Sequence, residues 1–561
     1  MNFSKKIDNI CEFIFKNYGI YEGFPKKDKL IIHDNVFGTL EFTEYERKII
    51  NSPFLQRLTQ ISQMGLANTV YPGAVHNRFS HSLGVSYIAE KIYIQVMKGE
   101  KRSNAKRKSD INTVKLAGLM HDIGHGPFSH VSDELLKRLS HYPSYKRKDI
   151  DAKIFARNTK SLKDVRNVHE FIAFHLLQSN SLKELISNVY SCIPLDQELI
   201  PYCITGNKEP SGNNYIPSKD LHKTLLIKII NGFSDADKID YLLRDSKFSG
   251  LPLPADIDRL ISFFKKIKPS NTSYELGVDE KGTRAFHLLL QSKAKMYPTV
   301  YQHHTTQSFE TILQFGIISA ILNVDEATVG LDSEKWPIIE YGLDLQYYTD
   351  NSLIDYLRII KDPISNDVVK RIYNRRHYRK LSRVYTWEIL RQNLRSTIEF
   401  KKTNVELKAL EKTGDIDKFE EKFKELYDKH TEEEEGKVSD FYRGFDTFDK
   451  IKKFKKDMIS KDPDIMKKLK SLLPNVEEEI LYNYGICIRI ADELPVNPYT
   501  QPYITRYNQF KNEIELLSLS QMKFREPKIL DYQQITFYSL PEISEKLEPI
   551  IKGFIKTKLL N

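Results

Sequence analysis

The pattern of apolar and polar positions predicts a chain built mainly of α-helices. In four segments, apolar residues recur every three or four positions, which is the spacing of one face of a helix. The segments cover residues 81–97, 114–125, 213–245 and 286–320. The first two are clearly amphipathic, so each is expected to bury one face against the core of the protein.

Strand-like patterns occur at two places along the chain. Residues 30–50 alternate apolar and polar positions around Gly38, which predicts a short hairpin followed by a helix that begins near Thr43. Toward the C-terminus, runs at 486–496 and 528–540 alternate in the same way and are bounded by prolines. This end of the chain is therefore expected to form an α+β lobe.

Length and charge density suggest how the chain divides into domains. Its 561 residues exceed the size at which a single core stops growing. We expect an N-terminal leader (1–30), a large helical domain (31–395), a densely charged helical region (396–475) and an α+β C-terminal lobe (476–561). The predicted fold class is mainly α, with a helical core and a smaller α+β C-terminal lobe.

The composition is typical of a cytoplasmic protein. Charged residues interrupt the apolar residues at the N-terminus, so no signal-peptide core is present. No apolar run approaches the roughly 20 residues of a membrane-spanning helix, and no membrane partner is expected. The four cysteines are too far apart for a zinc ribbon or a disulfide framework. They are Cys11, Cys192, Cys203 and Cys487.

The formal net charge of +10 favours anionic ligands such as phosphate. It is smaller than the charge of a dedicated nucleic-acid-binding chain. Two basic stretches, 98–108 and 145–148, lie in segments predicted to be loops. They are either solvated loops or patches that attract a polyanion toward the site.

The chemistry centres on the adjacent pair His121 and Asp122, which is followed by His125 and His130. If the helix of 114–125 continues through them, three of these polar groups crowd one arc among apolar residues. A single buried histidine is more often a core residue whose hydrogen bonds are satisfied. A buried imidazole beside a carboxylate, however, is well satisfied by a divalent cation. Mn, Fe, Zn and Ni suit such ligands, and Mg suits them less well.

Further ligands must come from other segments. His81 is at the start of a predicted helix, and Asp237 is on another helix. The alternative for the second segment is that Asp237, Lys238 and Asp240 form only a charged helix face.

Six separated motifs occur in one order between residues 30 and 325, and together they are more specific than a His-Asp pair alone. They are IHDNVFGTLEF, NSPFLQRL, YPGAVHNRFSHSLGV, AGLMHDIGHGPFSHVSDE, SDADKIDYLLRDS and MYPTVYQHH. With them the chain resembles the HD-domain superfamily of phosphohydrolases. Within it, the chain resembles the deoxynucleoside triphosphate triphosphohydrolases of the sterile-alpha-motif and HD-domain type and of the bacterial dGTPase-like type.

The resemblance implies roles for individual residues. The four metal ligands would be His81, His121, Asp122 and Asp237. The residues that bind or orient the phosphates and the attacking water would be His125, His130, Asp133 and His169. The residues lining the triphosphate would be Arg78, Lys238, Tyr241 and Lys293, and those surrounding the sugar would be Gln63, Met64, Asp245 and Tyr301.

Two positions depart from the family pattern. The segment between Asp133 and His169 is long and basic, so His169 also fits a surface or helix-capping histidine. Lys293 stands where the family has an arginine, which keeps the charge but loses the bidentate fork.

The resemblance implies an enzyme that hydrolyses a deoxynucleoside triphosphate (dNTP) to deoxynucleoside and tripolyphosphate, and that forms a homo-oligomer. Two alternatives remain open. The same metal site could act on a nucleic-acid strand or a signalling nucleotide, with the basic stretches as a track. The protein could also be a non-catalytic nucleotide sensor.

Overall fold

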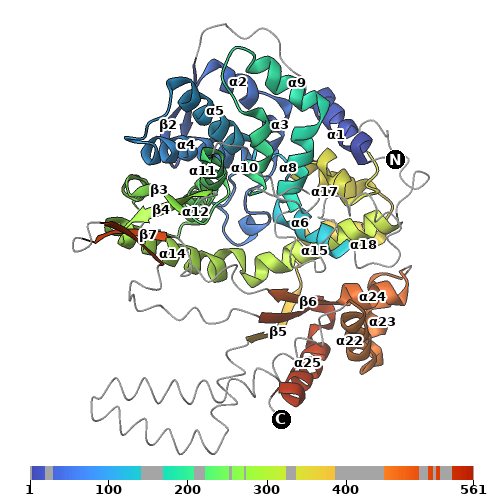
Figure 1. Ribbon diagram of the computed structural model, residues 1–561. Helices are drawn as coiled ribbons and strands as arrows, with labels where there is room; N and C mark the ends of the chain where they lie inside the picture. The colour runs from blue at the N-terminus through green and yellow to red at the C-terminus, as the bar shows by residue number, and fades with distance from the viewer. Residues whose placement is uncertain are drawn as a thin grey trace, which may run out of the picture. The chain divides into compact units, whose positions relative to one another are not determined.

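The structure is a computed structural model, which divides the chain into two compact units (Figure 1). Unit 1 comprises Met1–Val369 and Pro498–Phe524, and unit 2 comprises Lys370–Asn497 and Arg525–Asn561. The residues that the structure describes are 3–18, 29–139, 168–206, 221–251, 256–270, 273–323, 337–385, 448–474, 476–491, 503–508, 513–518 and 534–559.

The core of unit 1 is a set of packed helices around α4 and α5. Helix α4 packs along α5 and α12, while α10 and α11 pack against α5. A Cβ on Gly118 of α5 would come within 2.9 Å of the Ser86 Cα of α4, so the two helices approach closely. These helices are α4 (Arg78–Val96), α5 (Asn104–Met120), α10 (Ile200–Ile204), α11 (His222–Ile230) and α12 (Ala236–Ser249).

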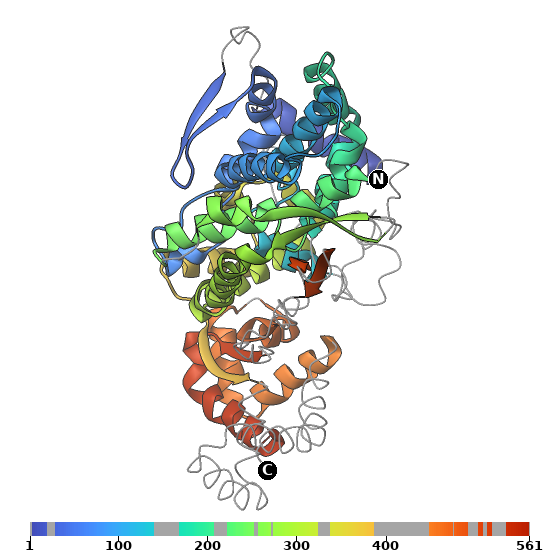
Figure 2. The same cartoon turned by 60° about the vertical axis from the view of Figure 1, so that its left-hand side comes forward.

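The predicted hairpin and the helix after it are confirmed. Strands β1 (Leu30–Asp34) and β2 (Gly38–Phe42) pair antiparallel, as Figure 2 shows for the hairpin in blue. Helix α2 (Glu44–Ile50) begins after Thr43. The Thr43 and Glu46 side chains each accept a hydrogen bond from the other's backbone N–H, which is a capping box.

The helix predicted over 81–97 is confirmed as α4, but the one predicted over 114–125 ends earlier than expected. Helix α5 ends at Met120, and residues 121–124 form a turn. A Cβ on Gly124 would lie 2.1 Å from the His169 carbonyl oxygen, so the turn passes directly against α8 (Val168–Gln178). Tertiary packing, which periodicity does not show, thus ends the helix. The pair His121 and Asp122 therefore follows the helix instead of lying on it.

Other helical predictions are confirmed in part. The segment 286–320 is two helices, α14 (Thr283–Met296) and α15 (His304–Asn323), separated by a π-helical turn η6 (Tyr297–Tyr301). The expected loop at 98–108 is wrong in its second half, because α5 begins at Asn104 with Ser103 as its N-cap. Of 213–245, residues 213–220 lie outside the described residues.

Unit 1 also contains a four-stranded sheet that the sequence patterns did not predict. Its strand order is β3-β4-β7-β8, with β4 and β7 parallel and the other pairs antiparallel. The last two strands come from the segment Pro498–Phe524, which follows part of unit 2 in the chain. The strands are β3 (Phe264–Ser270), β4 (Ser273–Asp279), β7 (Tyr503–Asn508) and β8 (Glu513–Ser518).

The remaining elements of unit 1 complete the helical core. They are α1 (Phe3–Tyr18), α3 (Pro53–Arg57), η1 (Leu58–Gln60), η2 (Ala67–Thr69), α6 (His130–Leu139), α8, α9 (Asn180–Val189), η4 (Gln197–Leu199), α13 (Ile257–Ser262), η5 (Glu280–Gly282), η7 (Gly342–Tyr347) and α17 (Asp350–Ile359). Helix α18 (Pro363–Tyr373) spans the boundary between the units. None of the described helices has both the length and the apolar composition required to cross a membrane.

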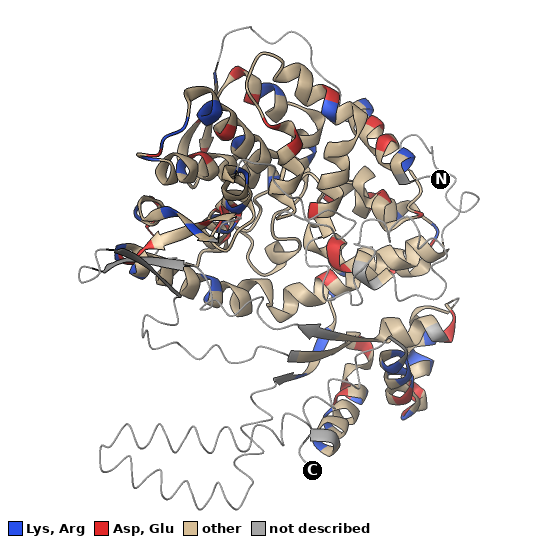
Figure 3. Ribbon diagram, in the orientation of Figure 1, with Lys and Arg blue, Asp and Glu red and all other residues tan. Residues whose placement is uncertain are grey.

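Unit 2 contains helices and a three-stranded antiparallel sheet of order β5-β9-β6. Lysines gather on α22, as Figure 3 shows in blue. The predicted fold class, mainly α with a smaller α+β part, is confirmed. The predicted domain limits stay predictions, because 386–447 lie outside the described residues. The elements are β5 (Arg379–Tyr385), α22 (Phe448–Ser460), α23 (Pro463–Leu472), α24 (Glu478–Gly485), β6 (Ile486–Ala491), β9 (Gln534–Ser539), η9 (Pro541–Ile543) and α25 (Ser544–Leu559).

The N-terminal helix α1 is packed into unit 1. Ile10 and Ile14 of α1 are buried, and the buried Lys6 Nζ forms an ion pair with Asp344 Oδ1 of η7. Burial raises the pKa of the Asp344 carboxyl to about 6, although Lys6 acts to lower it. Because this pKa lies above its unfolded value, ionisation of Asp344 destabilises the fold as pH rises through about 6.

We therefore predict that Lys6→Met destabilises the protein more at pH 8 than at pH 5. Without the ammonium group, the pKa of Asp344 rises further, so the acid stays neutral at pH 5 and is an unpaired buried anion at pH 8. The expected loss at pH 8 is about 3 to 5 kcal/mol. Urea unfolding followed by circular dichroism measures it, with the exposed Lys5→Met as the control. An equal loss at both pH values would contradict this prediction.

Candidate active site

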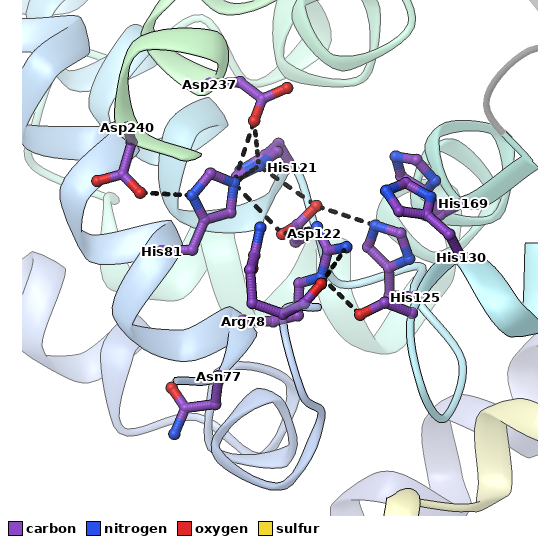
Figure 4. A network of polar contacts seen from close by, with 12 residues as sticks. Asn77, Arg78, His81, His121, Asp122, His125, His130, His169, Asp237 and Asp240 are labelled. Carbon is purple, nitrogen blue, oxygen red and sulfur yellow. Dashed lines mark hydrogen bonds and ion pairs between the residues drawn. The ribbon is translucent and has the colours of Figure 1, made fainter. Parts of the chain in front are cut away.

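The structure brings the four predicted metal ligands together in unit 1, although they come from three separate segments (Figure 4). His81 is in the first turn of α4, His121 and Asp122 follow α5, and Asp237 is in the first turn of α12. His81 Nε2 lies 3.2 Å from His121 Nε2 and 3.1 Å from Asp237 Oδ1. His121 Nε2 lies 3.3 Å from Asp122 Oδ1 and 3.9 Å from Asp237 Oδ1. The four side chains thus surround one point.

These spacings fit a divalent cation. Ligand atoms about 2.1 Å from an ion are about 3.0 to 3.4 Å apart in octahedral or tetrahedral geometry. Three distances among the four residues, from 3.1 to 3.3 Å, fall in that range, whereas His81 Nε2 to Asp122 Oδ2 and His121 Nε2 to Asp237 Oδ1 are longer, at 3.7 and 3.9 Å. Two imidazoles and two carboxylates suit a transition-metal ion.

Hydrogen bonds on the outer side of each imidazole determine which nitrogen faces the centre. His81 Nδ1 lies 2.6 Å from Asp240 Oδ2, and His121 Nδ1 lies 2.8 Å from the Gly118 carbonyl oxygen. Both partners are acceptors, so both Nδ1 atoms carry protons. In the neutral rings, the two Nε2 lone pairs then face each other at 3.2 Å, which is repulsive unless a proton or a metal cation lies between them.

The carboxylates around His81 strongly favour positive charge at this point. Burial alone would lower the pKa of His81, but Asp237, Asp240 and Asp122 together raise it to about 10. The same electrostatic attraction that would hold a proton there would hold a metal ion.

Asp240 is itself held by a buried network that the sequence analysis did not assign to the site. Arg244 Nε and Nη2 each donate to an Asp240 oxygen at 2.9 Å, and Arg244 Nη1 donates to Asp34 Oδ2 at 2.7 Å. Asp34 is the last residue of β1, so the hairpin is linked to the metal ligand His81. The signal available in the sequence was the i,i+4 spacing of Asp240 and Arg244 on one helix.

Arg78 supports the ligand Asp122 from the other side. Its Nη1 donates to Asp122 Oδ2 at 2.9 Å, its Nε to Ser129 Oγ at 2.8 Å, and its Nη2 to the Gln63 carbonyl oxygen at 3.2 Å. Although burial opposes ionisation, Arg78 and the neighbouring histidines hold the pKa of Asp122 well below its usual value. Here Arg78 binds protein groups, and its role in triphosphate binding stays a prediction.

The loop that carries Ser129 has a strained backbone. Phe128 and Ser129 have φ angles of 56° and 57°, which residues other than glycine rarely adopt. Asp350 at the start of α17 holds this loop, because its carboxylate accepts from Phe128 N at 2.6 Å and from Ser62 N at 2.9 Å. Asp350, which lies in the later part of unit 1, thereby fixes the Phe128–Ser129 loop beside the predicted metal ligands.

A second group of histidines lies next to the metal ligands. Asp133 Oδ2 lies 2.6 Å from His169 Nδ1 and 3.3 Å from His130 Nδ1. The His125 and His169 rings are stacked, with centroids 3.7 Å apart and an interplanar angle of 19°. Nitrogen lone pairs in stacked rings lie in parallel planes and do not converge on one ion. This group is therefore better suited to proton transfer than to a second metal ion.

The pKa values of the two stacked histidines are shifted in opposite directions. Burial lowers the pKa of His169, but the Asp133 carboxylate outweighs it, so the pKa is raised overall. Burial, with Arg78 and His169 nearby, lowers the pKa of His125 well below its usual value. Both ring nitrogens of His125 are buried without a hydrogen bond to any described residue, and Nε2 lies 3.3 Å from Asp122 Oδ1. A polar substrate group or water would satisfy them.

Two of the predicted sugar residues, Asp245 and Tyr301, lie on α12 and η6. Tyr301 Oη donates to Asp245 Oδ2 at 2.7 Å. The Tyr301 ring makes edge contacts with Tyr241 and with Tyr297, a neighbour that the sequence analysis did not identify. The predicted sugar residues Gln63 and Met64 are buried in the segment before α4.

Two lysines provide positive charge near Asp237. Lys238 Nζ donates to the Gly232 carbonyl oxygen at 2.8 Å and pairs with Asp235. Lys293 forms no ion pair with any described residue, and its Nζ lies 5.9 Å from the centre of the Tyr297 ring. Burial and the nearby Lys238 lower the pKa of Lys293 to about 8. An anionic ligand would stabilise this ammonium group.

Both arginines of the basic stretch 98–108 bind groups of the protein itself. Arg102 binds both carboxylate oxygens of Asp110, and Arg107 donates to the backbone carbonyl oxygens of Met97 and Glu100. The second basic stretch, 145–148, lies outside the described residues. These contacts favour a structural role for the arginines over a track for a polyanion.

Comparison with known proteins agrees with this site. Residues 78–198 match the HD domain, and residues 255–417 match the HD associated region. The chain is 28% identical to bovine deoxynucleoside triphosphate triphosphohydrolase SAMHD1, over 62% of this chain and 58% of that protein. It is 29% identical to the human SAMHD1 protein, over 63% and 54% of the two chains.

A viral relative is also similar. The chain is 30% identical to a putative HD domain-containing protein of Acanthamoeba polyphaga mimivirus, over 53% of this chain and 60% of that protein. The matched regions thus span less than two thirds of each of these three relatives. From its matched regions and its His-Asp cluster, the chain belongs to the HD-domain phosphohydrolases with an HD-associated region, and it is distantly related to the SAMHD1 enzymes.

Proposed function

We propose that this protein hydrolyses deoxynucleoside triphosphates to deoxynucleoside and tripolyphosphate, with a divalent cation held by His81, His121, Asp122 and Asp237. The observation that carries the proposal is the pair of inward-facing imidazole nitrogens 3.2 Å apart, flanked by carboxylates. The SAMHD1 relatives, whose name describes this reaction, support the choice of substrate. Self-association stays a prediction.

In this mechanism, the bound cation supplies positive charge for the phosphate oxygens and makes a water molecule more acidic. Arg78 holds Asp122 in the orientation in which it would bind the cation, while Lys293, which forms no ion pair with any described residue, would bind the triphosphate. Water attacks the α-phosphorus, and the bond from phosphorus to the 5′-oxygen breaks.

The departing 5′-oxygen needs a proton, and in this proposal His169 supplies it. Asp133 raises the pKa of His169, so the imidazolium form persists near neutral pH. The proton that the attacking water releases then restores the protonated histidine, which balances the step.

The direct test offers the metal-loaded protein each dNTP, each ribonucleotide and single-stranded DNA, and separates the products by chromatography. We expect deoxynucleoside plus tripolyphosphate from dNTPs. His121→Ala should lose at least about a thousandfold in turnover and lose bound metal, because a ligand is missing. Metal content by mass spectrometry is the second readout. Shortened DNA strands, or turnover retained by His121→Ala, would contradict the proposal.

The contact between His81 and Asp240 predicts a change in metal affinity. Asp240→Asn removes the negative charge behind His81 and places an amide beside Arg244, so the dissociation constant for Mn²⁺ should rise about 10- to 100-fold. Competition with a chromogenic chelator measures it, and circular dichroism checks folding. The control is Asp258→Asn, because Asp258 pairs with Lys91 but is exposed. Equal affinity in the two variants would rule out this role for Asp240.

The His169 and Asp133 pair predicts a pH dependence. Because a raised pKa keeps the acid form to higher pH, turnover should fall as pH rises through the pKa of His169. Asp133→Asn removes the charge that raises this pKa, so the alkaline limb should move to lower pH. Steady-state kcat between pH 5.5 and 9 measures the shift, with His33→Gln, at an exposed histidine of β1, as the comparison. An alkaline limb that stays in place in Asp133→Asn would exclude His169 as the proton donor.

A further inference from the structure

His76 joins two of the residues predicted to contact the sugar. Its Nε2 lies 2.7 Å from Asp245 Oδ1, and its backbone carbonyl oxygen accepts from Gln63 N at 3.0 Å. The side chain is buried, and its ring stacks on Phe248 with centroids 4.5 Å apart and an interplanar angle of 25°. His76 belongs neither to the metal ligands nor to the proton-transfer group.

The loop that carries His76 is held at two points, one on η6 and one on α12. Tyr71 Oη donates to the Thr299 carbonyl oxygen of η6 at 2.7 Å. A Cβ on Gly73 would come within 2.8 Å of the Phe248 carbonyl oxygen of α12, so only glycine allows this approach. The imidazole of His76 is therefore held in place before any substrate arrives, which lowers the entropy lost on binding.

The hydrogen bonds around Asp245 define what it can recognise. An ionised carboxylate only accepts hydrogen bonds, so His76 Nε2 donates to Oδ1 and Tyr301 Oη donates to Oδ2. Each oxygen can accept a second hydrogen bond. The carboxylate is thus prepared for a substrate group that donates, such as a sugar hydroxyl, and it repels phosphate oxygens.

We propose that His76 is a positioning residue for sugar recognition, which fixes the Asp245 carboxylate so that it accepts a hydrogen bond from the 3′-hydroxyl of the substrate. This inference rests on the proposed function. With only Tyr301 as a partner, the carboxylate can rotate about its Cβ–Cγ bond. The site then loses its preference for a substrate that carries the 3′-hydroxyl.

The test compares deoxynucleoside triphosphates with their 2′,3′-dideoxy counterparts, using kcat and KM of the metal-loaded protein. The unaltered protein should prefer the deoxy substrate. His76→Ala should raise KM for the deoxy substrate about tenfold, because a hydrogen bond to a charged group contributes about that factor in affinity. It should leave kcat and the KM for the dideoxy substrate nearly unchanged. Most of the preference for the deoxy substrate is then lost. His76→Gln, whose amide can still donate, should restore part of it.

Phe248→Leu is the matched control, because it removes the ring stack and leaves the hydrogen-bond donor, so the preference should be kept. A His76→Ala variant with the unaltered preference would overturn the role of His76 and leave dNTP hydrolysis standing. Equal loss of kcat on both substrates would also overturn it, since that is the signature of a structural defect. If the unaltered protein hydrolyses no nucleotide, the proposed function fails and the inference fails with it.

Discussion

The organisation of the site depends on the positive charge that two buried imidazoles and the carboxylates around them require. The His81 and His121 nitrogens that face each other have their protons on the far side, and carboxylates stand around them. Such an arrangement is costly in a medium of low dielectric unless positive charge compensates it. The buried pairs of Arg78 with Asp122 and of Arg244 with Asp240 keep the surrounding carboxylates ionised and oriented.

The helices of unit 1 bring these charged side chains close together. Helices α4 and α12 each carry one predicted ligand in the first turn, and two more lie in the turn just after the end of α5. The dipoles of α4 and α12 present positive ends near the site, which favours anions there. Residues after position 340 also hold this region in place. Gln346 Nε2 donates to the Gly124 carbonyl oxygen at 2.8 Å, and Asp350 accepts a hydrogen bond from the backbone of the strained loop.

The sequence predicted the parts of this structure that depend on local pattern. The hairpin and helices α2 and α4 follow from spacing and capping residues, and the metal ligands come from motifs that the structure brings together. The end of α5 could not be predicted, because it depends on the close approach of Gly124 to α8. Asp240 and His76 were missed for a similar reason. Their importance comes from contacts with residues more than a hundred positions away.

The sheet β3-β4-β7-β8 has a consequence for how the chain is made. The chain leaves unit 1 after Val369 and returns at Pro498, so two strands of this sheet are synthesised after most of unit 2. Domains generally fold during synthesis as their residues emerge from the ribosome. Strands β3 and β4 are synthesised more than two hundred residues before β7 and β8. The edge of β4 that pairs with β7 therefore stays unpaired until β7 has been synthesised. Unit 1 can therefore complete this sheet only after the intervening segment has been synthesised.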